Sequence, residues 1–261
     1  MTEPVWGQGE AYERFMGRWS VQVADEFLAW LDVEPGLRWL DVGCGTGALS
    51  SRILERSAPA WLAGVDPSPA FVETARARLG PDADVRVGDA QALPFADDAF
   101  DVAVSGLVLN FVPDPAKAVA EQARAATRLV AAYVWDYAEG MDMLRIFWEE
   151  ATALDPASAG LDEGERFPLA REHRLQALFA DAGLRGVRSR ALEVPASFTD
   201  FDDLWNPFLG GQGPAGALVV SLDEARREEL RRRLRDRLRP SGNEPIELRL
   251  RAWAVSGGIP G

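Results

Sequence analysis

Residues 39–47 read W-L-D-V-G-C-G-T-G, and Ala48 follows them. A short apolar run ends here in a glycine-rich turn, which is typical of a buried strand followed by a ligand-binding loop. Two loop patterns fit the same residues. Gly43, Gly45 and Gly47 form G-x-G-x-G, whereas Gly43, Gly45 and Ala48 satisfy the G-x-G-x-x-G/A pattern of dinucleotide-binding proteins. The glycines alone therefore leave the ligand open.

Strand-like and helix-like segments alternate on both sides of this turn. Short apolar runs predict strands, and apolar residues at i, i+3 and i+4 spacing predict helices. Five strands joined by short links and helices indicate a parallel sheet that is covered on both faces. The predicted strands span 37–42, 60–66, 84–89, 100–106 and 129–137, and the helices between them span 48–57, 68–79 and 114–128.

The flanking segments extend this pattern. Residues 10–32 read as one or two helices, and the second half holds helices at 141–154, 170–183 and near 223–239, a loop at 157–168, and strands at 187–195 and 245–255. We therefore predict an α/β fold, a Rossmann-like doubly wound sheet of seven strands, mostly parallel with an antiparallel last strand. We expect one domain over 1–261, with an N-terminal helical region (1–36), a ligand-binding core (37–140) and a remainder (141–261) that carries a helical insertion (196–240).

Composition narrows the class of partner. The 261 residues are 47% hydrophobic and carry a formal net charge of −13, which disfavours nucleic acid and anionic membranes as partners. No stretch approaches eighteen uninterrupted apolar residues, and the N-terminus lacks the basic and apolar regions of a signal peptide. We expect a soluble, cytoplasmic protein. Its single cysteine, Cys44, excludes an intrachain disulfide.

Two aspartates bear on the identity of the ligand. Asp66 ends the second strand about twenty residues beyond the loop, where a carboxylate can accept from ribose hydroxyls, and both NAD and S-adenosylmethionine carry that ribose. Asp41 discriminates between them, because a carboxylate there would oppose a pyrophosphate by roughly a kcal/mol but would favour a cationic sulfonium or ammonium. The alternative is that Asp41 only orients the loop.

A third acidic position completes a recognisable set. Gly88-Asp89-Ala90 after the third strand can offer a carboxylate to an adenine amino group and a backbone N–H to a ring nitrogen. The sequence now resembles the class I S-adenosylmethionine-dependent methyltransferases, especially the small-molecule group related to ubiquinone/menaquinone biosynthesis methyltransferases. The resemblance covers about 37–140, and R-W-S at 18–20 also resembles the N-terminal helical region of these proteins. It is carried by L-D-V-G-C-G-T-G (40–47), G-V-D-P-S (64–68), G-D-A (88–90) with L-P-F (93–95), and F-D-V-A-V-S (100–105).

The resemblance implies S-adenosylmethionine as cofactor and S-adenosylhomocysteine as its product. It assigns the glycine loop to the methionine part, Asp66 to the ribose, Asp89 and Ala90 to the adenine, and the backbone near Ser105 and Gly106 to closing the methyl-donor pocket. The full set of expected cofactor-binding residues is Arg18, Asp41, Gly43, Cys44, Gly45, Thr46, Gly47, Asp66, Pro67, Ser68, Asp89, Ala90, Ser105 and Gly106. The sequence departs from the family where Arg128 runs directly into Leu129, without the usual Pro-Gly-Gly-type turn.

Methyl transfer is an in-line displacement at an activated carbon, so alignment of the two reactants supplies most of the catalysis. A general base is needed only when the acceptor must lose a proton of high pKa. Candidate acceptor-side residues are Asp136 and Tyr137, for which the alternative is packing, and His173, for which the alternative is a solvated surface position. No cluster has metal-ligand spacing, so we expect no metal.

The acceptor side is less defined. The aromatic segment 198–214 either closes over an apolar acceptor or packs as an ordinary amphipathic helix. Other activities stay open as alternatives, namely an NAD-dependent oxidoreductase and a protein that binds S-adenosylmethionine without transferring its methyl group. The sequence predicts a small-molecule acceptor but neither the accepting atom nor the oligomeric state.

Overall fold

The computed structural model describes residues 16–238 and 245–260, so the predicted helical residues 10–15 lie outside the described part. The chain groups into two compact units. The helical unit contains the residues up to Trp19, Asp136–Pro168 and Glu193–Arg251, and the sheet unit contains Ser20–Trp135, Leu169–Leu192 and the residues from Ala252 onwards. The single domain expected from the sequence stays a prediction.

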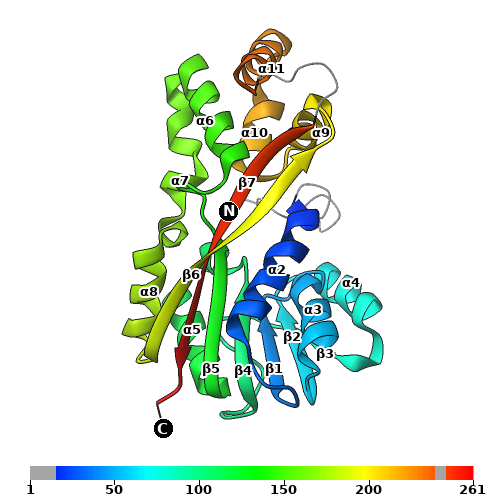
Figure 1. Cartoon of the computed structure of the whole chain (residues 1–261), viewed down its shortest axis with the longest axis vertical. Coiled ribbons are helices and arrows are strands. Elements are labelled where there is room, and N and C mark those ends of the chain that lie inside the picture. Colours follow the sequence, from blue (N-terminus) through cyan, green and yellow to red (C-terminus); the bar gives the residue numbers. More distant parts are fainter. Residues whose placement is uncertain (1–15, 239–244, 261) are drawn as a thin grey trace. The chain divides into compact units, whose positions relative to one another are not determined.

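Seven strands form one sheet in the order β3-β2-β1-β4-β5-β7-β6 (Figure 1). Strands β1 to β5 pair in parallel, and β7 runs antiparallel to β5. This arrangement confirms the predicted Rossmann-like, mostly parallel sheet. The strands are β1 (Arg38–Val42), β2 (Trp61–Asp66), β3 (Asp84–Val87), β4 (Phe100–Gly106), β5 (Ala126–Trp135), β6 (Arg185–Phe198) and β7 (Ile246–Gly258).

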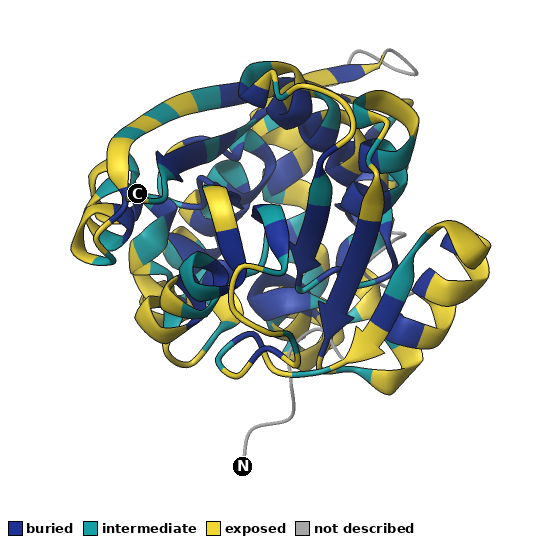
Figure 2. Ribbon diagram, turned by 90° about the horizontal axis from the view of Figure 1, so that it is seen from below, coloured by how far each residue is buried: buried dark blue, intermediate teal, exposed yellow. Residues whose placement is uncertain are grey.

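Helices cover both faces of the sheet within the sheet unit. On one face, Phe27 packs on Tyr133 with ring centroids 4.6 Å apart, and Val85 contributes to the apolar cluster beneath α4. On the other face, Phe179 of α8 joins the cluster that contains Val134. The central strands β1, β4 and β5 between them are mostly buried (Figure 2). The helical elements are α2 (Arg18–Leu31), α3 (Ala48–Ser57), α4 (Pro69–Leu79), η2 (Gly80–Asp82), η3 (Leu109–Phe111), α5 (Pro115–Ala125) and α8 (Glu172–Asp181).

The helix before β5 ends earlier than the sequence predicts. We expected the helix to reach residue 128, but α5 ends at Ala125 and β5 begins at Ala126. Residues 126–128 leave the helix because Ala126 pairs with Phe100 of β4, and Thr127 donates its hydroxyl to the Phe100 carbonyl at 3.2 Å. The missing Pro-Gly-Gly-type turn is thus accommodated by a direct helix-to-strand transition.

The helical unit consists of short helices and the adjoining ends of β6 and β7. Its elements are α6 (Asp142–Leu154), η4 (Pro156–Leu161), α7 (Glu163–Arg166), η5 (Pro168–Ala170), α9 (Phe201–Trp205), η6 (Asn206–Gly210), α10 (Gly213–Ser221) and α11 (Glu224–Leu238), although η5 runs on into the sheet unit. The predicted loop at 157–168 was wrong, because Asp155 and Asp162 accept hydrogen bonds from Ala157 N and Gly164 N and so cap two short helices.

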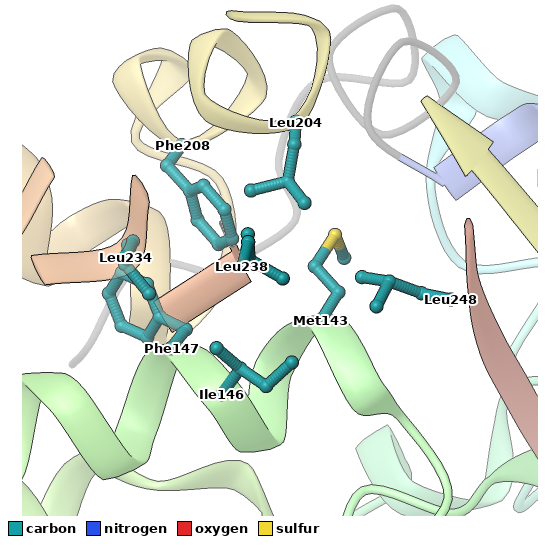
Figure 3. A pocket seen from close by; sticks show the side chains of 8 residues that line it. All are labelled: Met143, Ile146, Phe147, Leu204, Phe208, Leu234, Leu238 and Leu248. Atoms are coloured by element: carbon teal, nitrogen blue, oxygen red, sulfur yellow. The ribbon is translucent and has the colours of Figure 1, made fainter. Parts of the chain in front are cut away.

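Apolar side chains hold the helical unit together. The rings of Phe147 and Phe208 lie 4.8 Å apart and nearly parallel. They help to line a narrow apolar gap that has no room for a water molecule and is therefore part of the core (Figure 3). Phe201 and Trp205 are also buried, so much of the aromatic segment 198–214 is packed rather than exposed. In the described ranges, no helix has both the length and the apolar character needed to cross a bilayer.

Candidate functional site

The order of the strands in the sheet reverses between β1 and β4, which run parallel to each other. From β1 the sheet continues through β2 to β3 on one side and through β4 to β5 on the other. In open α/β sheets this switch point is where ligands bind. The loop between β1 and α3 lies there, and it contains Gly43, Gly45 and Gly47.

Hydrogen bonds and close packing set the shape of the glycine loop. The Val65 carbonyl accepts from Gly43 N at 2.7 Å and from Cys44 N at 3.0 Å. Gly43 has a φ of +73°, and a Cβ there would meet a Val108 methyl group at 2.5 Å, so only glycine fits. A Cβ on Gly45 would meet nothing within 4 Å. The loop is therefore tight against Val108 and open at Gly45.

Asp41 lies beneath this loop and is only 1% exposed. Its Oδ2 accepts a hydrogen bond from the Ser50 hydroxyl at 2.6 Å. Its buried Oδ1 has no partner among the residues that the structure describes. Burial, with a smaller contribution from the charge of Asp66, raises the pKa of Asp41 to about 7 against the lowering effect of Ser50. Within the described part of the chain, Asp41 Oδ1 is therefore an unsatisfied acceptor, and a cation would both satisfy it and favour the carboxylate.

Asp66 ends β2 and connects two loops. Its Oδ2 accepts from Gly45 N at 3.0 Å, and its Oδ1 accepts from Ser68 N at 2.9 Å. Burial raises the pKa of Asp66 despite these two bonds. Each carboxylate oxygen keeps a further lone pair, so the group can still accept from ligand hydroxyls. Ser68 also caps α4, since its hydroxyl accepts from Phe71 N at 3.4 Å, and the exposed Pro67 lies between the two residues.

Asp89 follows β3 and is exposed, while Ala90 is buried. The Asp89 carboxylate accepts from Gln91 N at 2.9 Å and from the Gln91 side-chain amide at 3.1 Å, and the pKa of Asp89 is lowered mainly by these bonds. A ligand that binds Asp89 would therefore compete with Gln91 or share the carboxylate with it. The sequence showed no sign of this partner.

The end of β4 (Ser105 and Gly106) is closely packed, and Leu107, which follows it, has an unusual backbone conformation. Ser105 is fully buried, and its hydroxyl has no partner among the described residues. A Cβ on Gly106 would lie 2.6 Å from the Tyr133 hydroxyl oxygen, which comes from the neighbouring strand β5. Leu107 then adopts a left-handed φ of 64°. Such conformations are rare outside glycine and are concentrated at functional sites.

Arg18, Asp136 and Tyr137 belong to the helical unit. Arg18 pairs with Asp203 at 3.2 Å and lies over the Trp19 and Phe198 rings. Asp136 is 1% exposed.

Arg251 binds the carboxylate of Asp136, with Nη2 at 2.5 Å and Nε at 2.7 Å from Oδ2. Tyr137 is buried, and its ring lies 5.3 Å from that of Phe167. The remaining candidate, His173, is exposed on α8 of the sheet unit.

The structure thus brings the glycine loop, Asp41, Asp66 and the Gly106 segment together at one edge of the sheet unit. Sequence reasoning missed Ser50, Val108 and Tyr133. A signal for Ser50 does exist, because it is the third residue of α3 and helix side chains lean toward the N-terminus of their helix, here toward the loop. The contacts of Val108 and Tyr133 depend on strand pairing and leave no local signal.

Parts of this chain are similar to known proteins. Residues 40–128 match the methyltransferase domain family. An uncharacterized methyltransferase of Mycobacterium tuberculosis is 37% identical over 114 residues, which are 44% of this chain and 44% of the relative. The ubiquinone/menaquinone biosynthesis C-methyltransferase of Ruegeria sp. is 35% identical over 105 residues, which are 38% of this chain and 42% of the relative. The match therefore spans less than half the length of these curated relatives.

A solved structure shares the fold. The phosphoethanolamine N-methyltransferase 2 of Haemonchus contortus, in complex with S-adenosyl-L-methionine, superimposes with a TM-score of 0.57 at 14% identity, covering 97% of this chain and 57% of that chain. The two chains therefore share a Rossmann-like fold built on a mostly parallel sheet. Residues 40–128 thus carry a match to the methyltransferase domain family, and this chain shares its fold with solved methyltransferases.

Proposed function

We propose that this chain binds S-adenosylmethionine at the carboxyl edge of its sheet unit and transfers the methyl group to a small-molecule acceptor. The unpartnered Oδ1 of Asp41 is the observation that carries the proposal. A buried, unsatisfied carboxylate oxygen suits a ligand that brings a cation and opposes one that brings a pyrophosphate. The NAD-dependent alternative is disfavoured on this ground.

The residues of the sheet unit fit the cofactor. The glycine loop is open at Gly45, where a ligand can approach the backbone closely. We assign the loop to the methionine part, Asp66 to the ribose hydroxyls, and Asp89 with Ala90 to the adenine. Gly106 and Ser105 would close the methyl-donor pocket. When bound, the cofactor supplies an activated methyl carbon, and the protein holds it in a fixed orientation.

Asp136 and Tyr137 stay candidates for the acceptor side. Asp136 is a poor candidate for a general base, because taking up a proton would weaken its bonds to Arg251. We therefore expect alignment, rather than a strong base, to carry the reaction, which favours acceptors that are already nucleophilic. The absence of nucleic-acid partners belongs to the same proposal and rests on the formal net charge of −13. A cytoplasmic location stays a prediction from the sequence.

Two measurements test the proposal in sequence. Titration calorimetry with S-adenosylmethionine and S-adenosylhomocysteine should show binding at sub-millimolar concentrations, and no binding would refute it. Release of S-adenosylhomocysteine across a panel of phenols, quinols and amines should then identify the acceptor class. Binding without turnover of any acceptor would favour a protein that holds the cofactor without transferring its methyl group. A rise in NADH fluorescence on mixing would instead support the oxidoreductase alternative.

A further inference from the structure

Ser50 has no role in the assignment above, yet it is completely buried in the first turn of α3. Its hydroxyl lies 2.6 Å from Oδ2 of Asp41. A hydroxyl has one hydrogen to donate, so Ser50 can satisfy only one of the two carboxylate oxygens. The other oxygen, Oδ1, is buried and unpartnered among the described residues.

This asymmetry restricts the Asp41 side chain. The carboxylate group can rotate easily in the absence of contacts, because its terminal torsion is broad. The short bond to Ser50 stops that rotation and keeps Oδ2 turned toward α3. Oδ1 is thereby held pointing away from the Ser50 hydroxyl. An acceptor that is already held in place loses less entropy when a ligand binds.

We propose that Ser50 is a positioning residue for the cofactor, and that its hydroxyl fixes Asp41 so that Oδ1 meets the cationic part of the ligand. This inference rests on the proposed S-adenosylmethionine site. Ser50 touches no ligand itself and acts only through Asp41.

The electrostatics of the site provide a specific readout. The charged group that acts on Asp41 is Asp66, whose charge disfavours a second carboxylate. Burial and the charge of Asp41 raise the pKa of the Cys44 thiol, which therefore stays neutral. The pKa of Asp41 is about 7 with the Ser50 bond in place. Because that bond favours the carboxylate, its loss should raise the pKa of Asp41 further and leave less of the binding-competent form at neutral pH.

The experiment measures the affinity of the full chain for S-adenosylmethionine and S-adenosylhomocysteine between pH 6 and pH 9. The wild-type affinity should rise about ten-fold between pH 6 and pH 8, as Asp41 loses its proton. Ser50→Ala should bind about ten-fold more weakly at pH 7, with the midpoint of the rise displaced to higher pH and the difference from wild type narrowing toward pH 9. Titration of the ligand's own amino group cancels when variants are compared at one pH.

Two further variants separate the possible causes. Ser51→Ala removes the neighbouring hydroxyl of α3, which bonds the Gly47 carbonyl at 2.8 Å and not Asp41, and should leave the midpoint unchanged. Asp41→Asn should abolish the rise over this range. The inference fails if Ser50→Ala weakens binding equally at every pH or leaves it unchanged. Failure of the wild-type chain to bind either ligand would instead refute the proposed function.

Discussion

Asp41 should make the ligand-free protein sensitive to pH. Its pKa is about 7 in the folded chain, against an unperturbed value of 3.8, so the folded state keeps this proton to a higher pH than the unfolded state does. The proton on Asp41 therefore stabilises the folded state. This stabilisation is fully present below about pH 4 and is lost as the pH rises to about 7. The pKa difference of about three units, at about 1.4 kcal/mol per unit, corresponds to about 4 kcal/mol of free energy of unfolding.

Asp41→Asn removes this titration and leaves an oxygen for the Ser50 hydroxyl. Its amide nitrogen would face the site unpartnered, which costs about 1–3 kcal/mol at every pH and so does not affect the comparison between two pH values. Urea unfolding can be followed by tryptophan fluorescence at pH 5 and at pH 8. Between these two pH values, the free energy of unfolding should fall by about 3 kcal/mol more for wild type than for the variant. Other titrating groups, including Glu163, are common to both chains and cancel. Equal losses in the two chains would refute the raised pKa.

Three other changes test separate parts of the structure. Asp66→Ala removes the acceptor for Gly45 N and for the proposed ribose hydroxyls. Calorimetry should show that S-adenosylhomocysteine binds more weakly by about 2–3 kcal/mol, or roughly 30- to 150-fold. An unchanged affinity would mean that the ribose lies elsewhere. Burial raises the pKa of Glu163 to about 7, so this group should make the free energy of unfolding of wild type fall by about 3 kcal/mol between about pH 4.5 and pH 7. Glu163→Gln should lack this part of the fall, which urea unfolding at both ends of the range would measure. Gly106→Ala should destabilise the chain by about 1–3 kcal/mol in urea, because its Cβ would meet the Tyr133 hydroxyl, and adding Tyr133→Phe should recover part of the loss.

Local patterns predicted the sheet well because each strand carries its own apolar run. The predicted strand 100–106 and helix 48–57 coincide with β4 and α3. The glycine loop was also predictable from the sequence, because its backbone conformation requires glycine. All three of its glycines adopt a positive φ. The boundary at Ala126 was missed because β4 pairing, rather than helix propensity, decides where α5 ends.

The contacts that shape the site were beyond local patterns. Arg251 binds Asp136 across 115 residues of sequence, and Val108 covers Gly43 because strands β1 and β4 are neighbours. Such pairs become visible only once strand order and register are known. Burial of Asp41 is a further case, because its raised pKa depends on the packing around it and on the charge of Asp66.

The chain's one cysteine lies inside the glycine loop and is buried. Burial raises the pKa of the Cys44 thiol, and the sulfur packs closely against Gly64. A thiol in this state reacts slowly with alkylating reagents, because the thiolate is scarce and access is blocked. The rate at which an alkylating reagent labels Cys44 therefore reports the opening of the glycine loop. The native chain allows this motion to be measured without an added probe.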